Sequence, residues 1–117
     1  MPSNRHRLER RIRELVEASA LLREKLQQYE TTMNKIAGRL EKGEPGITAA
    51  KGTGIPSDRR LVTEAIDNFE AARHELRLAL MALGREEGAS ISEVGRVLGI
   101  SRQLASRLAG EVAEADS

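Results

Sequence analysis

The sequence predicts an all-α protein. A long N-terminal coiled-coil helix is followed by a Gly/Pro linker and by a second long helix that leads into two short C-terminal helices. Three observations predict this arrangement. Apolar residues repeat in heptads through residues 8–40, alternating β-branched runs are absent, and residues 88–108 contain two capped segments joined at a glycine. With 117 residues, the chain can bury one modest core.

The first helix is predicted from apolar residues spaced alternately four and three positions apart. We assign Leu8 to heptad position d and Ile12 to position a, and a repeat over more than four heptads predicts a coiled coil. Ser3 or Asn4 can cap its start, and Gly43 can end it. The residues predicted to hold an oligomer together are Leu8, Ile12, Leu15, Leu22, Leu26, Tyr29, Met33, Ile36 and Leu40.

The apolar stripe of this helix is wider than the seam of a simple two-stranded coil. Val16, Ala18 and Ala37 lie at the flanking e and g positions, where two-stranded coils usually carry charge. A four-helix bundle that includes the second long helix would also use these residues. The sequence therefore predicts that residues 1–42 form a homodimer or a higher oligomer, and leaves the parallel and antiparallel arrangements open.

Residues 43–57 are predicted to be a linker. Four glycines and two prolines within fifteen residues are expected to prevent a helix there. The second long helix is expected to begin at Ser57 or Asp58 and to end near Arg85. Its stretch 76–83 is apolar on nearly every side, which predicts burial on every side within a helical domain that spans residues 58–117.

The two short helices are predicted within residues 90–109. Ser90 and Glu93 have the spacing of a capping box, and Ser101 can cap the second helix. Gly99 lies where the chain must turn, because glycine adopts positive φ without steric cost. Gly95 leaves room for the two helices to cross. The residues expected to face inward are Val94, Val97, Leu98, Leu104, Ala105 and Leu108.

The outward face of the second short helix carries the chemistry of a surface that reads DNA. Arginine suits guanine O6 and N7, and glutamine suits adenine N6 and N7. A serine at the cap can hold a phosphate in addition. The predicted DNA-binding residues are Ser101, Arg102, Gln103, Ser106 and Arg107.

This stretch resembles the helix-turn-helix motif of bacterial transcription regulators and of the DNA-binding region of sigma factors. The small residue Gly95, the turn residue Gly99, the apolar Ile100 and the inward Leu108 carry the resemblance. Ala105 departs from it, because a bulkier valine or isoleucine is usual at that position. The resemblance implies that the second short helix enters the major groove of double-stranded DNA.

The charge distribution qualifies this expectation. Residues 1–42 carry ten basic and six acidic side chains, a net +4, whereas residues 58–117 carry eight basic and eleven acidic side chains, a net −3. Because phosphate neutralisation supplies most non-specific affinity for DNA, the C-terminal part alone is expected to bind weakly. The possible phosphate contacts at the N-terminus are Arg5, Arg7, Arg10 and Arg11.

Other classes of function have little support in the sequence. There is no cysteine for a disulfide or a thiolate metal site, and no apolar run long enough to span a membrane. His74 follows Glu70 by one helical turn, a spacing typical of a surface ion pair. We therefore expect a cytoplasmic protein of the nucleoid that is not an enzyme and has no metal, cofactor or small-molecule ligand.

Two functions remain open from the sequence. The first is sequence-specific DNA binding by a dimeric regulator of transcription or a nucleoid-associated factor. The alternative is an interaction adaptor whose helix-turn-helix contacts a protein such as the transcription machinery. The acidic balance of residues 58–117 favours the adaptor, and the outward arginines favour DNA.

Overall fold

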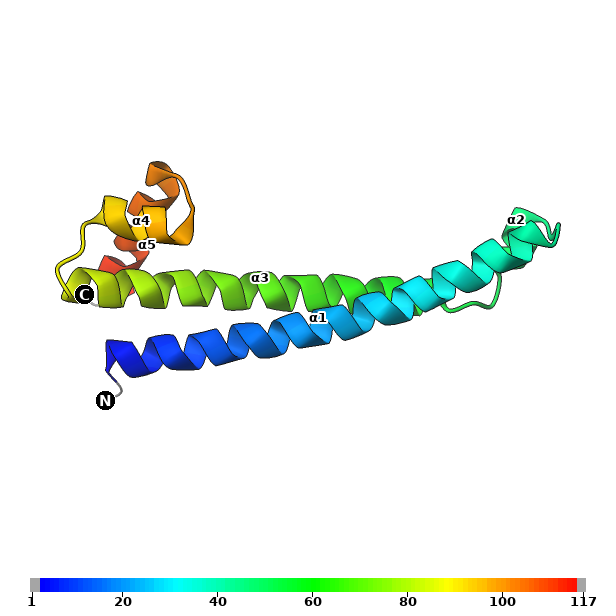
Figure 1. The fold of residues 1–117 in the computed structure, drawn as a ribbon, viewed down its shortest axis with the longest axis horizontal. Helices are drawn as coiled ribbons and strands as arrows, with labels where there is room; N and C mark the ends of the chain where they lie inside the picture. Colours follow the sequence, from blue (N-terminus) through cyan, green and yellow to red (C-terminus); the bar gives the residue numbers. More distant parts are fainter. Residues whose placement is uncertain (1–2, 116–117) are drawn as a thin grey trace. The chain divides into compact units, whose positions relative to one another are not determined.

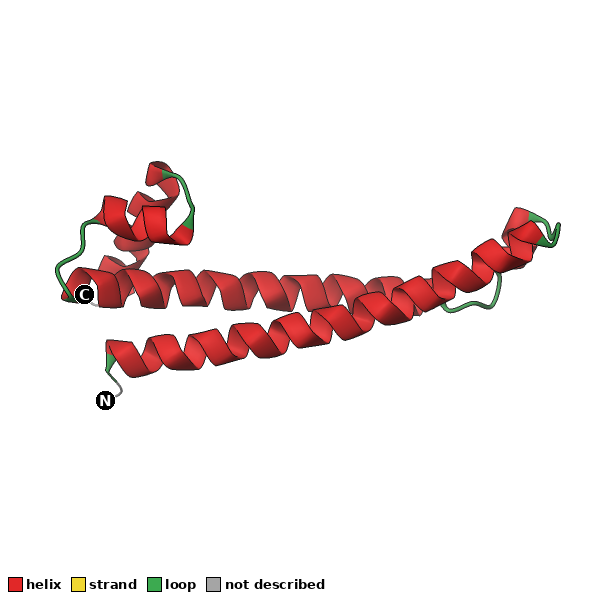
Figure 2. Ribbon diagram, viewed as in Figure 1, coloured by secondary structure: helices red, strands yellow, loops and turns green. Residues whose placement is uncertain are grey.

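The computed structural model describes residues 3–115, which form five α-helices and no β-strand (Figure 1; Figure 2). The ends of the predicted domains, residues 1–2 and 116–117, lie outside the described residues. The prediction of an all-α chain is confirmed for the described part. None of these helices is both long and apolar enough to cross a membrane. The helices are α1 (Asn4–Glu41), α2 (Gly46–Ala50), α3 (Ile55–Glu86), α4 (Ile91–Leu98) and α5 (Arg102–Ala115).

Helix α1 begins and ends close to the predicted residues. The Ser3 hydroxyl accepts a hydrogen bond from the His6 backbone N–H at 3.1 Å, and this satisfies one of the free donors at the start of the helix. At the other end Gly43 has a φ of 89°, and the N–H of Glu44 donates to the carbonyl of Arg39 at 3.2 Å. This is a Schellman ending, which satisfies carbonyls of the last turn.

The predicted linker is not entirely free of helix. Residues 46–50 form the short helix α2, although the high content of glycine and proline predicts none. Pro45 precedes this helix with a φ of −58°, an angle that suits the entry to a helical turn. Ala49 is fully buried, and its carbonyl accepts a hydrogen bond from Arg39 Nη1 at 3.2 Å. Local packing therefore outweighs the weak intrinsic propensity of this segment.

The chain divides into two compact units. One unit combines Met1–Val16 with Ala71–Ser117, and the other is Glu17–Glu70. Helices α1 and α3 each continue from one unit into the other. Helix α3 begins at Ile55, slightly earlier than predicted, and ends at Glu86.

Polar contacts show that α1 and α3 run antiparallel within the first unit. Asn4 Nδ2 donates a hydrogen bond to Glu86 Oε2 at 2.7 Å, which joins the first residue of α1 to the last residue of α3. Further along α1, Arg11 Nη2 lies 3.5 Å from Glu75 Oε2. Later residues of α1 therefore contact earlier residues of α3, as in an antiparallel pair of helices.

The same antiparallel pairing holds within the second unit. The Thr32 hydroxyl donates a hydrogen bond to the carboxylate of Asp58, near the start of α3. Thr32 is the most buried polar residue of α1, with 8% of its surface exposed. The carboxylate therefore satisfies a hydroxyl that would otherwise be buried without a side-chain partner.

These contacts identify the face of α1 that meets the rest of the chain. Four residues of α1 that bond to α2 or α3 each come directly before an a position and so occupy heptad position g. They are Asn4, Arg11, Thr32 and Arg39. The neighbouring d positions are half-buried, and they are Leu8, Leu15, Leu22, Tyr29 and Ile36.

The a positions behave differently from the d positions. Ile12, Leu26 and Leu40 leave 44%, 41% and 48% of their surfaces exposed. Ser19 is exposed as well, and Met33 is half-buried. In the single chain, the a and d positions of the expected seam therefore differ in their exposure to solvent. The d side adjoins the residues that bond α3, while most of the a side faces solvent.

The core of the first unit is formed by α3, α4 and α5 together. Its fully or nearly fully buried members are Met81 of α3, Val94 of α4, and Ala105 and Leu108 of α5. Residues 76–83, at the apolar end of α3, are all buried or half-buried, and of these Ala79 and Met81 are the ones that are fully or nearly fully buried. The two short helices are therefore held on the C-terminal end of α3.

Candidate nucleic-acid interface

The connection between α4 and α5 has the geometry that its glycine predicts. Gly99 has a φ of 69°, in the left-handed region. Its N–H donates to the Arg96 carbonyl at 3.2 Å, and the N–H of Ile100 donates to the Gly95 carbonyl at 3.0 Å. This pair of bonds is a Schellman motif, which ends α4 and places Ile100 back against the core.

Both short helices are capped at the predicted serines. The Ser90 hydroxyl accepts from the Glu93 N–H at 3.1 Å, and the Ser101 hydroxyl accepts from the Leu104 N–H at 3.1 Å. Each bond satisfies a donor that the helix itself leaves unpaired. The start of α5 is therefore defined by Ser101, and this sets which of its residues point away from the core.

The two short helices approach closely at Gly95, as the sequence predicts. A Cβ atom at Gly95 would lie 3.0 Å from the Cβ of Ala105. Ala105 is fully buried at this crossing. It is the residue at which the sequence departs from the usual helix-turn-helix pattern. Glycine on one helix and alanine on the other bring the two backbones together.

The outward face of α5 brings four of the five predicted DNA-binding residues onto one surface. Arg102, Gln103, Ser106 and Arg107 are all exposed and line one shallow depression. Arg102 and Ser106 lie one helical turn apart, as do Gln103 and Arg107, whereas Ala105 and Leu108 of the same helix are buried. The fifth residue, Ser101, is also exposed, but its hydroxyl is engaged as the cap of α5.

A second depression adjoins the first and contains an arginine that sequence reasoning missed. Arg96, in the last turn of α4, is exposed and lines this depression with Ser92 and Arg102. Arg102 Nη2 lies 3.5 Å from the Ser92 hydroxyl, at the limit of a hydrogen bond. The signal for Arg96 was its place one residue after Gly95, on the side of α4 opposite the inward residues.

The N-terminal arginines differ in how far they are engaged by the protein. Arg5 is exposed, and its side chain has no partner among the described residues. Arg10 Nε lies 3.9 Å from Glu14 Oε1. Arg11 is half-buried, with Nη1 at 2.9 Å from Glu14 Oε2. Of these three, Arg5 is the least constrained and Arg11 the most.

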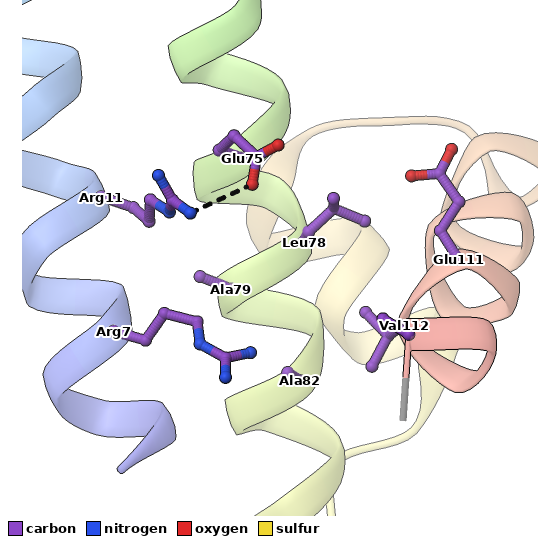
Figure 3. A pocket seen from close by; sticks show the side chains of 9 residues that line it. Arg7, Arg11, Glu75, Leu78, Ala79, Ala82, Glu111 and Val112 are labelled. Atoms are coloured by element: carbon purple, nitrogen blue, oxygen red, sulfur yellow. Dashed lines mark ion pairs between the residues drawn. The ribbon is translucent and has the colours of Figure 1, made fainter. Parts of the chain in front are cut away.

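Arg7 and Arg11 line a pocket of the first unit, which Figure 3 shows from close by. The Arg11 side chain extends from α1 toward Glu75 of α3, while Arg7 lies beside Ala79 and Ala82. Arg7 is exposed and its guanidinium forms no ion pair within the described chain. It therefore keeps its charge available for a ligand, whereas Arg11 pairs with two carboxylates.

One residue of α4 does not lie where the sequence predicts it. The apolar pattern places Val97 on the inward face, but 77% of its surface is exposed. The inward arc of this helix is centred on the buried Val94 and Gly95 with half-buried Ile91 and Leu98, and Val97 falls outside that arc. Val97 instead lines a small apolar groove with Leu80, Gly84, Ala89, Glu93 and Val94.

Gly84 is a second residue that sequence reasoning missed. A Cβ atom at this position would lie 2.7 Å from Cγ2 of Val94, so the glycine allows α4 to pack against α3. In the sequence, a glycine inside an otherwise apolar helical stretch indicates that another element packs closely there. The sequence does not show that this element is α4.

His74 is engaged in a contact between helices. Its Nε2 lies 2.9 Å from Glu111 Oε2, which links α3 to α5. This partner is remote in the sequence, whereas the helical spacing by itself points to Glu70. Among residues 3–115, no group of three or more histidine, aspartate or glutamate side chains is arranged to hold a metal ion.

Comparisons of this chain with protein-family models, with curated proteins and with solved structures found no match.

Proposed function

We propose that this chain binds double-stranded DNA sequence-specifically as a homodimer, and that α4 and α5 act as a helix-turn-helix. In this role it is a regulator of transcription or a nucleoid-associated factor. The observation that carries the proposal is the exposed face of α5, where Arg102, Gln103, Ser106 and Arg107 share one surface. The resemblance to helix-turn-helix regulators supports the same assignment.

The arrangement of α5 suits entry into the major groove. Its inward side is held by Ala105 and Leu108, so its outward side chains extend from a rigid support. Arg102 and Arg107 are the candidates for guanine, and Gln103 is the candidate for adenine. Ser106 is short enough to let the helix approach the base edges closely. Ser101 lies at the N-terminus of α5, where backbone N–H groups favour a phosphate.

Non-specific affinity has to come from outside the helices that read the sequence. Residues 58–117 carry a net charge of −3, whereas residues 1–42 carry +4. Arg5 and Arg7 are exposed and unpaired within the described chain, which supports a role in phosphate contact. Arg11 is the weakest of the four candidates, because leaving Glu14 and Glu75 would cost it two ion pairs.

The proposal is tested by gel shifts with a DNA sequence selected from a random pool and with unselected DNA, at two salt concentrations. Arg102→Ala, Gln103→Ala and Arg107→Ala are each expected to lose about 1–3 kcal/mol of preference for the selected sequence. Arg59→Ala is the matched control, since Arg59 is exposed on α3 and unpaired in the described chain. Absence of DNA binding by the wild type at low salt would refute the proposal.

Val97 favours a second candidate function, an adaptor that contacts a protein such as the transcription machinery. Its exposed side chain borders an apolar groove, and the acidic balance of residues 58–117 does not suit phosphates. Val97→Ser is expected to abolish binding of a protein partner in this case. If DNA is the ligand of the α5 face, the same variant should retain sequence preference, so the pair of measurements separates the two functions.

A further inference from the structure

We propose that His74 is a positioning residue for the outward face of α5. It binds the Glu111 carboxylate on the side of α3, and so leaves the Arg107 guanidinium without a partner and available for DNA. All three residues belong to the first unit. The consequence for DNA binding rests on the proposed function, whereas the role of His74 toward Glu111 and Arg107 is testable without DNA.

The first argument is the contact itself, which joins α3 to the C-terminal half of α5. His74 Nε2 lies 2.9 Å from Glu111 Oε2, and the two side chains are 45% and 48% exposed. Leu78 follows His74 by one turn of α3 and lines the same pocket as Val112, the residue after Glu111 (Figure 3). Leu78 and Val112 both pack against the core of this unit. The packing of α3 on α5 therefore brings the imidazole to the carboxylate.

The second argument is the place of Glu111 on α5. Gln103, Arg107 and Glu111 are spaced four residues apart, so they follow one another on successive turns along the same side of the helix. An arginine and a glutamate at this spacing attract each other on a helix surface. Arg107 is nevertheless exposed and has no hydrogen bond or ion pair with any of the described residues. The carboxylate within its reach is the one that His74 binds.

The third argument is the charge of the proposed reading face. Residues 102–110 of α5 contain no acidic side chain, and Glu111 is the first that the helix reaches. An arginine that contacts guanine uses its N–H groups for O6 and N7, so a carboxylate bound to Arg107 would compete with the base. Exposed pairs of this kind are weak, and we expect loss of His74 to lower DNA affinity roughly twofold to fivefold.

NMR spectra of the full chain without DNA test the contact directly. The measured signal is that of the Arg107 Nε–H group, which is identified by its loss in Arg107→Ala. His74→Ala is expected to shift this signal, because the released carboxylate of Glu111 then pairs with Arg107. His74→Gln is expected to leave it at the wild-type position, since the amide nitrogen of glutamine can donate to the carboxylate in place of the imidazole. Adding Glu111→Gln to His74→Ala should also restore the wild-type position.

His6→Ala is the matched control for these spectra. His6 is the second histidine of the chain and is exposed on α1, and its side chain has no partner among the described residues. This variant should leave the Arg107 signal unchanged. Glu111 also lines the pocket that contains Arg7 and Arg11. An unchanged Arg107 signal in His74→Ala, or a shift at Arg7 or Arg11 in its place, overturns the inference.

Fluorescence anisotropy with the selected DNA sequence tests the consequence for binding. His74→Ala should weaken binding, and Glu111→Gln in the same chain should restore it. In an Arg107→Ala background, His74→Ala should have no further effect. A loss of the same size in that background would show that His74 only supports the structure, and would overturn the inference while leaving the proposed function in place. A wild type that does not bind DNA refutes the proposed function, whereas the Arg107 signal still decides the role of His74.

Discussion

At the scale of single residues, the positions with clear roles are those where local geometry leaves few alternatives. Gly99 is one of them, because its φ of 69° lies in a region that strains any residue with a Cβ. Ser90 and Ser101 are others, because each hydroxyl accepts from a specific backbone N–H. These residues hold the chain in the form that turns α5 outward. Ser101 is also one of the residues proposed to contact DNA, whereas Gln103, Ser106 and Arg107 are exposed on the outward side of α5.

Gly99→Ala is expected to lower the free energy of unfolding by about 1–2 kcal/mol, because alanine in the left-handed region is strained. Gly110→Ala is the matched control, since Gly110 lies inside α5, has a negative φ, and has open space where the Cβ atom of alanine would lie. That change should raise stability by up to about 1 kcal/mol through helix propensity. Thermal or urea unfolding measures both, and equal effects would contradict the assigned turn.

At the scale of elements, the association of α4 with α3 depends on a gap rather than on a large side chain. Gly84 leaves the space that Cγ2 of Val94 occupies, and Val94 is 4% exposed. Gly95 and Ala105 provide the corresponding close approach between α4 and α5. Small residues at both contacts allow three helices to share the core around Met81. The position of α5 on α3 therefore depends on two close contacts between helices. One is between α3 and α4 at Gly84, and the other is between α4 and α5 at Gly95.

Gly84→Ala tests the first of these contacts through its coupling to Val94. In the wild-type background the added methyl group should lower the free energy of unfolding by about 1 kcal/mol, because overpacking outweighs the gain in helix propensity. In a Val94→Ala background the clash is removed, and the same change should become stabilising. Urea unfolding of the four proteins in this cycle gives the coupling. Strictly additive effects would show that the two residues do not meet.

At the scale of the whole molecule, the proposed function places phosphate contact and base recognition in distant parts of the sequence. Residues 1–42 carry the positive charge, while residues 58–117 carry the proposed reading face within an acidic background. The first unit contains both the exposed arginines Arg5 and Arg7 and the helices α4 and α5. Ile12, Leu26 and Leu40 at the a positions of α1 are exposed in the single chain. In the proposed function, non-specific affinity and sequence preference therefore depend on different residues.

Replacing Arg5 and Arg7 together with glutamine tests this division. If they bind phosphates, the slope of log affinity against log salt should decrease by up to about 0.9 for each arginine that neutralises a phosphate, while sequence preference stays unchanged. Arg59→Gln with Lys51→Gln removes the same charge from two other exposed residues and serves as the control. Gel shifts over a salt series measure the slope. An equal change in both double variants would indicate a general charge effect and no specific role for Arg5 and Arg7.

The sequence by itself determined the features that depend on neighbours a few residues away. The helical class, the serine caps and the turn at Gly99 belong here, because each depends on bonds within about one turn of helix. Only the tertiary structure decided which stripe of α1 meets α3, since a heptad pattern marks both the a and d positions as apolar and does not distinguish their partners. The exposure of Val97, the gap at Gly84 and the short helix α2 were decided in the same way. Each depends on which distant surface is present to cover a side chain, and that information appears only when the helices pack.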